Sequence, residues 1–367
     1  MGSDLLLVIV VAAALLFDFT NGFHDTANVV ASAISTRAIS PRPAVALASI
    51  LNFVGALLSL NVAATIATGI VSAGAVTEMI AFAALVGAIS WNLVTWVFGL
   101  PSSSSHALIG ALIGALLAGA GSGAVNWHGL LTKVVEPAVF APLVAFLLAG
   151  LAIVGIYRIV AHWRPGSVSR GFRLMQLVSG GALSVAHGTN DAQKTMGIIG
   201  LALVAHGDLS ANDFQVPLWV ILSAATAMGL GTYAGGWRII RTVGTRIIKM
   251  DPVQGVAAQG SGAAVILVSS HLGFPLSSTQ VISGGVMGAG AAKSLSAVRW
   301  GVASNILIAW FLTLPVSALL GAVAYWIAAL FGSGVLGPIL IVVAAAAGAA
   351  YLIRWRRQPF ATLETGA

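Results

Sequence analysis

The stretch Asn21-Gly22-Phe23-His24-Asp25-Thr26-Ala27-Asn28 recurs in related form about half a chain later, as His187-Gly188-Thr189-Asn190-Asp191-Ala192-Gln193-Lys194. Each copy places an aspartate, Asp25 or Asp191, in otherwise apolar sequence. An aspartate in the hydrocarbon interior of a membrane costs roughly 2.5 to 3.5 kcal/mol even on the lenient insertion scale, so it is kept where it binds something. Two such residues in matching places predict one composite site.

The composition is that of an integral membrane protein. Hydrophobic residues make up 58% of the chain, charged residues 7%, and the mean hydropathy is +0.99; a soluble domain would carry about 25% charged residues. Runs such as 44–64 and 334–352 approach the roughly 20 apolar residues that cross a bilayer as a helix. Because backbone groups must be satisfied within the membrane, we predict an all-α bundle, and the alternating segments of a membrane β-barrel are absent.

Charge and cysteine content exclude several other classes. The chain has 17 Lys and Arg against 10 Asp and Glu, mostly in short loops, which indicates membrane topology and not nucleic-acid binding. The absence of cysteine excludes a disulfide framework and a thiolate metal site. The first apolar run lacks a basic leader and a small-residue cleavage site, so we interpret it as a mature helix and not a signal peptide.

A second duplicated motif indicates that the two halves are repeats. Pro101-Ser102-Ser103-Ser104-Ser105-His106 matches Pro275-Leu276-Ser277-Ser278-Thr279-Gln280. The loop with Arg37 and Arg42 is basic, whereas its counterpart carries Asp208 and Asp213 and no Lys or Arg. By the positive-inside rule these equivalent loops lie on opposite faces of the membrane. Each half then crosses an odd number of times, as in secondary transporters built from inverted repeats with interrupted helices.

We predict five helical segments in each half and one more at the C-terminus. They are 4–36, 43–63, 78–98, 101–120 and 134–157, then 174–205, 216–236, 255–272, 275–292 and 300–327, and finally 335–353. This divides the chain into a first inverted repeat (1–161), a cytoplasmic linker (162–173), a second inverted repeat (174–332), an extra transmembrane helix (333–354) and a cytoplasmic tail (355–367). The Ser-rich segments could be re-entrant hairpins instead of crossings, and helix breaks are expected at the duplicated motifs.

The serine clusters have the features of helix starts that bind an oxyanion. Ser and Thr cap helices, and the free N–H groups of a first turn attract an anion through the helix dipole. Two such starts would offer a neutral, donor-rich cradle to a phosphate-like group. The expected contacts are Ser103, Ser104, Ser105, Ser277, Ser278 and Thr279. The alternative is that these hydroxyls only cap helices or bond back to the preceding turn.

The aspartate motifs are suited to a cation or a proton. Carboxylate and amide oxygens are hard ligands for Na⁺ or Mg²⁺. A carboxylate repels a phosphate dianion, so both occupy one site only if a cation or proton intervenes, which favours coupled transport. The expected site comprises Asp25, Asn28, Asn190, Asp191, Asn21 and Gln193, with Asp25 and Asp191 as metal ligands and with His24, His187, Lys194, His106 and Gln280 in support. Asp18 is either a cap or part of an access path.

Three stretches resemble the PiT-type inorganic phosphate transporters: NGFHDTANVVASAISTRA, WNLVTWVFGLPSSSSHALIGALIG and AHGTNDAQKTMGIIGLAL. The resemblance covers nearly the whole chain. It implies a symporter that brings phosphate into the cell, with Asp25 and Asp191 as the essential acidic pair and the serine clusters as phosphate contacts. It also implies a multi-pass protein of a bacterial cytoplasmic membrane and a homodimer.

The same resemblance bears on the coupling ion. Bacterial members are regarded as coupled to protons and able to carry a divalent metal-phosphate complex, whereas another branch uses sodium. In the sodium-coupled animal branch a glutamate stands at the position of Asn52, and here neither Asn52 nor its duplicate Thr226 is acidic. We therefore expect co-transported H⁺ or Mg²⁺ in preference to Na⁺, with no tightly bound cofactor, and count Asn52 among the supporting residues.

Other functions fit the pattern less well. An intramembrane protease could also use two aspartates that share a proton, but it needs no duplicated motif, so we expect no enzymatic activity. A channel would line a continuous pore with these polar residues. Within transport, sulfate or molybdate is the nearest competing cargo, although an ionised aspartate prefers a ligand that can still donate a proton, as phosphate can.

Overall fold

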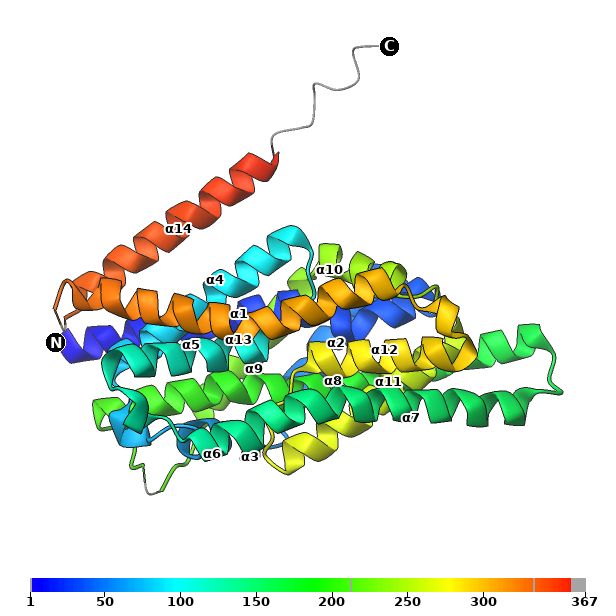
Figure 1. Ribbon diagram of the computed structural model, residues 1–367, viewed down its shortest axis with the longest axis horizontal. Helices are drawn as coiled ribbons and strands as arrows, with labels where there is room; N and C mark the ends of the chain where they lie inside the picture. The colour runs from blue at the N-terminus through cyan, green and yellow to red at the C-terminus, as the bar shows by residue number, and fades with distance from the viewer. Residues whose placement is uncertain (1, 212, 333, 358–367) are drawn as a thin grey trace, which may run out of the picture.

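We describe the protein from a computed structural model over residues 2–211, 213–332 and 334–357, so the predicted tail lies outside the described residues from 358 onward. Within these ranges the fold is all-α, as predicted, and its one extended pairing is a bridge between Val71 and Val125. Figure 1 shows long helices running side by side. They are α1 (Gly2–Ser35), α2 (Pro41–Ala56), α3 (Asn61–Ala64), α4 (Glu78–Phe98), α5 (Ser104–Gly119), α6 (Trp127–Leu130), α7 (Glu136–Val160), α8 (Pro165–His206), α9 (Leu218–Ala234), α10 (Trp237–Arg241), α11 (Pro252–His271), α12 (Ser278–Lys293), α13 (Trp300–Ala329) and α14 (Leu336–Arg357).

The described helices bear out a multi-pass membrane protein. Five are long and apolar enough to cross a membrane, or six if α2 and α3, bent by 64° at their break, count as one. The other predicted segments fall short for physical reasons. The helices α5 and α9 are shorter, and α8 is long but carries the polar second motif through its centre.

The segments predicted as 78–98 and 101–120 form one hairpin, α4–α5. The Asn126 N–H donates to the Ile70 carbonyl over 3.1 Å, so the chain before α4 meets the chain after α5. At this end Glu78 contacts His206, the last residue of α8. The hairpin turns at 99–103, around the first serine motif.

The helices α11 and α12 form a second hairpin that enters from the other end of α8. Here the Arg299 N–H donates to the Ile247 carbonyl over 3.0 Å, and Tyr157, near the end of α7, donates to Asp251. The two tips meet inside the protein, where the Ser105 hydroxyl donates to the Leu276 carbonyl over 3.1 Å. Both serine motifs therefore lie in the interior, as the re-entrant alternative for 101–120 and 275–292 requires, while their placement in the membrane stays a prediction.

The two halves interlock. The helix α13 packs along α4 and α5, and α7 packs along α11 and α12, so each hairpin is held by the last long helix of the other half. Close approach is made possible by glycine: a Cβ on Gly114 would lie 1.8 Å from the Ala318 carbonyl oxygen, and one on Gly288 would lie 2.0 Å from that of Phe146. The inverted repeats remain a prediction.

The aspartate motifs do not break their helices, contrary to expectation. The helices α1 and α8 run through them without interruption. The glycines serve packing instead: a Cβ on Gly22 would lie 2.5 Å from the Met228 carbonyl oxygen of α9, and one on Gly188 would lie 2.0 Å from that of Asn52 in α2. The predicted linker is also mostly helical, because α7 ends at Val160 and α8 begins at Pro165.

Candidate functional site

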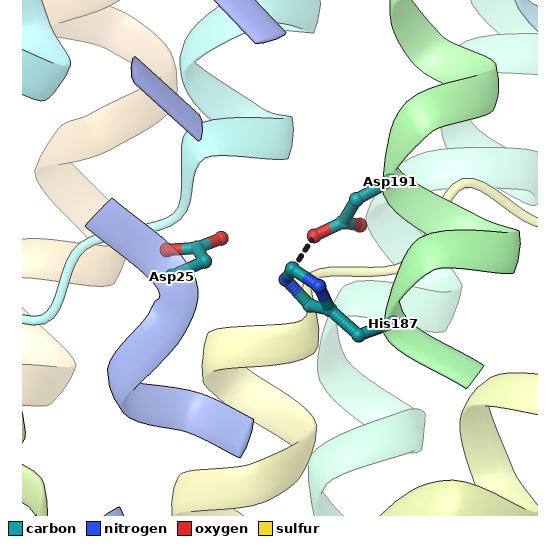
Figure 2. A group of neighbouring side chains, drawn as sticks. All are labelled: Asp25, His187 and Asp191. Atoms are coloured by element: carbon teal, nitrogen blue, oxygen red, sulfur yellow. Dashed lines mark ion pairs between the residues drawn. The ribbon is translucent and has the colours of Figure 1, made fainter. Parts of the chain in front are cut away.

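The two motif helices and the two hairpin tips converge on one buried site. The helix α1 contributes Asp25 and α8 contributes His187 and Asp191, and Figure 2 shows these side chains pointing toward one another. The starts of α5 and α12 bring the serine clusters to the same place. The predicted composite site is therefore assembled from both halves.

Asp25 accepts hydrogen bonds from three elements. The Ser104 hydroxyl of α5 donates to one carboxylate oxygen over 2.7 Å, and the Thr279 hydroxyl of α12 donates to the other over 3.3 Å. His24 Nδ1 lies 2.7 Å from the same oxygen as Thr279. The Asn28 amide donates to the Thr279 hydroxyl over 2.9 Å, so it reaches Asp25 through Thr279.

Asp191 lies among more donors, including a cation. The Ser278 hydroxyl donates to it over 2.9 Å and the Asn190 amide over 2.7 Å. His187, one helical turn before Asp191 on α8, has its Nε2 atom 3.0 Å from the same carboxylate oxygen as Ser278 (Figure 2). Lys194 forms an ion pair with the carboxylate. The carboxylate is therefore held by donors of both α8 and α12.

Lys194 breaks the symmetry of the site. Its side chain is fully buried, and its ammonium also donates to the Ser105 hydroxyl and, over 2.8 Å, to the Leu276 carbonyl. Its three donors are thus shared between α8 and both hairpin tips. The duplicated position in α1 is Asn28, so the first half supplies no matching charge.

The six predicted phosphate contacts divide into two groups. Ser103 and Ser277 cap α5 and α12 by accepting from the N–H groups of His106 and Gln280, over 3.1 and 3.3 Å, which is the alternative expected for them. The other four hydroxyls face the charged side chains: Ser104, Ser278 and Thr279 meet the carboxylates, and Ser105 meets Lys194.

Several predicted site residues lie one layer away. The Gln193 side chain accepts from the N–H groups of Val62 and Ala63, so it caps α3 and does not reach the carboxylates. His106 and Gln280 lie 3.3 Å apart and join the two hairpins. Asn52 lies 3.3 Å from His187 and donates to Thr232 over 2.8 Å.

Thr226, the predicted duplicate of Asn52, is exposed, and its hydroxyl donates to the backbone of its own helix. Thr232 is the residue of α9 that faces Asn52.

Asp25, His187 and Asp191 could together hold a metal ion. One ligand atom from each lies within 4.8 Å of the others, and all three residues are buried. The Asn190 Oδ1 atom is buried nearby without a hydrogen-bond partner. Two carboxylates with one imidazole suit a divalent cation. His187 was expected only to support the site, although its spacing of four residues from Asp191 already placed both on one face of a helix.

Residues 21–321 match the sequence model of the phosphate transporter family, which covers most of the chain. The chain belongs to the phosphate transporter family. The resemblance of the motifs is thereby confirmed, and the protein is a membrane transporter and not an enzyme.

Two relatives and one solved structure are similar to this phosphate transporter family member over most of its length. A Mycobacterium bovis protein named as a probable low-affinity inorganic phosphate transporter is 50% identical over 96% of this chain and 85% of its own. A Bacillus subtilis protein of the same name is 47% identical over 88% and 97%. A solved structure of a sodium-dependent phosphate transporter shares the fold with a TM-score of 0.79 and 26% identity, over 88% of this chain and 98% of its own.

Proposed function

We propose that this transporter imports inorganic phosphate together with protons, and that it accepts phosphate complexed with a divalent metal. The observation that carries the proposal is a shared set of donors. The Ser104 and Ser278 hydroxyls, at the two helix starts suited to an oxyanion, donate to Asp25 and Asp191. Carboxylate and phosphate thus compete for the same hydroxyls.

The charge balance requires a co-transported cation or proton. Asp25 and Asp191 bring two negative charges and Lys194 brings one positive charge. A phosphate anion added to this buried group is repelled until a carboxylate is neutralised. Neutralisation also weakens the hold of the carboxylates on Ser104 and Ser278, because hydrogen bonds to a charged acceptor are about twice as strong as neutral ones. The freed hydroxyls then turn to phosphate.

A proton in this role fits the contacts around Ser104. Its oxygen lies 2.6 Å from Asn21 Oδ1 and 2.7 Å from an oxygen of Asp25. A hydroxyl has one hydrogen and can donate it to only one of these acceptors. The second contact therefore takes its hydrogen from the other partner, which is either a protonated Asp25 or an Asn21 amide turned to present its NH₂ group.

A divalent metal ion would bind between Asp25 and Asp191, together with His187. Asp25, His187 and Asp191 would hold it, and its charge would screen the carboxylates from phosphate. Sodium coupling remains the alternative because the solved relative is named as sodium-dependent. Against it, Asn52 is neutral, and its amide is already engaged by Thr232 and His187.

Radiolabelled phosphate uptake into proteoliposomes tests the proposal. The purified chain is reconstituted and given an inward proton gradient or an inward sodium gradient, each with and without Mg²⁺. We expect accumulation driven by the proton gradient and increased by Mg²⁺. Accumulation that follows sodium alone would overturn the coupling ion, and sulfate uptake in place of phosphate would overturn the cargo.

A further inference from the structure

Asp18 is a buried acid that the phosphate site does not use. It lies on α1 seven residues before Asp25, on the side of the N-terminus, and none of its surface is exposed. Neither of its carboxyl oxygens has a hydrogen-bond partner among the described residues. It caps no helix, because α1 extends from Gly2 to Ser35 around it. One of the two roles expected from the sequence is thereby excluded.

The two polar groups nearest Asp18 are donors with no other hydrogen-bond partner among the described residues. They are the Thr195 hydroxyl of α8 and the NH₂ group of Asn21, one turn along α1, and both are buried beside the Asp18 carboxyl. The carboxyl, the hydroxyl and the NH₂ group therefore lie against one another, with no cation among them. A buried carboxyl without a cation needs a proton or another positive charge to become neutral.

The charges around Asp18 do not neutralise it. The strongest charged influences come from Asp191 and Lys194 of α8, and Lys194 is already committed to Asp191, Ser105 and the Leu276 carbonyl. The other helices that pack on α1 carry titratable groups mainly near their ends. Glu78 of α4 contacts His206, and His106 of α5 contacts Gln280. Tyr233 of α9 is exposed, and α2 and α10 contribute Arg42 and Arg241. An ionised carboxylate without a cation in such surroundings is strongly disfavoured.

A proton satisfies this site better than a metal ion does. The oxygens at hand number at most four: the two of Asp18, that of Thr195 and, with its amide turned, that of Asn21. Divalent cations of the calcium and magnesium type take about six oxygens or more. A proton needs only one, and a protonated carboxyl can then donate to the Thr195 hydroxyl.

We propose that Asp18 carries a proton in this state and that this proton is transported with phosphate, as a protonation site separate from the Asp25 and Asp191 pair. The protonation of Asp18 does not depend on the proposed function, whereas the transport of its proton rests on the proposed phosphate–proton symport. The Asn21 side chain links the two places, since it lies between Asp18 and Ser104, which contacts Asp25. The duplicated position in α8 is Ser184, so the second half has no equivalent acid.

The test compares Asp18→Asn, which keeps the shape but cannot release a proton, with Asp213→Asn, the same change in an exposed loop. Protons moved per phosphate are counted in proteoliposomes with an internal pH dye and radiolabelled phosphate. We expect Asp18→Asn to keep phosphate exchange at zero gradient and to move one proton fewer per phosphate, with Asp213→Asn unchanged. A wild-type proton count in Asp18→Asn would overturn the proposal.

Infrared spectroscopy gives a readout that does not depend on transport. We expect the wild-type protein in membranes to show a protonated-carboxyl C=O band that Asp18→Asn removes and Asp18→Glu shifts. If Asp18→Asn does not fold, Asp18→Glu alone decides. A band unaffected by either substitution would contradict the proposal, as would a band abolished by sodium at constant pH. If phosphate uptake by the wild-type protein does not depend on the proton gradient, but the carboxyl band is removed by Asp18→Asn, then the proposed proton symport is wrong and the protonation of Asp18 is still supported.

Discussion

Replacing Gly188 by alanine tests whether the second motif is positioned by close contact between α8 and α2. A Cβ at this position would lie 2.0 Å from the Asn52 carbonyl oxygen and 2.7 Å from its carbonyl carbon. Ordinary contacts of a Cβ begin near 3.4 Å. The two backbones must therefore separate by about 1.4 Å, and overpacking of this kind costs about 1 to 3 kcal/mol.

The separation would also disturb the site. The contact between His187 and Asn52, now 3.3 Å, would lengthen, as would the hydrogen bond from Thr189 to the Gly55 carbonyl, now 2.9 Å. We expect the free energy of unfolding of Gly188→Ala to be lower by about 1 to 3 kcal/mol, so that it unfolds at a lower temperature. We also expect it to take up phosphate more slowly.

Thermal unfolding of the purified protein, followed by its tryptophan fluorescence, measures the first effect. The matched control is Gly171→Ala on the same helix, where a Cβ would meet nothing within 4 Å. There alanine gains helix propensity of up to about 1 kcal/mol, so stability should stay the same or rise. Gly188→Ala as stable as Gly171→Ala would refute the packing argument.

Three further outcomes follow from the contacts at the site. Lys194→Met leaves the Asp191 carboxylate buried without its cation and should destabilise the protein by about 3 to 5 kcal/mol; adding Asp191→Asn should restore part of this loss, which thermal unfolding would detect. Ser104→Ala should weaken phosphate binding, measured by calorimetry, because it removes a donor at the site. Ser103→Ala should lower stability by about 1 kcal/mol through the lost cap, with a smaller effect on phosphate affinity.

The residue types of the site could be predicted from the sequence because its motifs are duplicated. The two aspartate motifs and two serine motifs are polar clusters in apolar surroundings, so their meeting was predictable. His187 and Asp191 are spaced by four residues, a signal for one helix face that the sequence alone already contained. The position of Gln193 was not predictable, because it caps α3, a helix that exists only beyond the break at 57–60.

The hairpins could not be distinguished from crossings by loop charge. Two crossings replaced by one re-entrant hairpin leave the parity of each half unchanged, so the positive-inside rule gives the same answer for both. Pro101 and the serines indicated a helix start but not its depth. Depth follows from a contact between distant residues, the bond from Ser105 to the Leu276 carbonyl. In the same way, helix breaks were expected at the duplicated motifs, whereas the structure shows that Gly22 and Gly188 of these motifs make close packing contacts with neighbouring backbones.

In the proposed mechanism, Asp25 couples phosphate to a cation by holding and releasing the Ser104 hydroxyl. The most direct test is Asp25→Asn, in which phosphate binding to the purified protein and gradient-driven accumulation in proteoliposomes are both measured. We expect binding to persist, since the neutral amide competes less strongly for Ser104, and accumulation to fall strongly, because the carboxylate whose neutralisation couples phosphate to a cation is gone. Accumulation at the wild-type level by Asp25→Asn would contradict it.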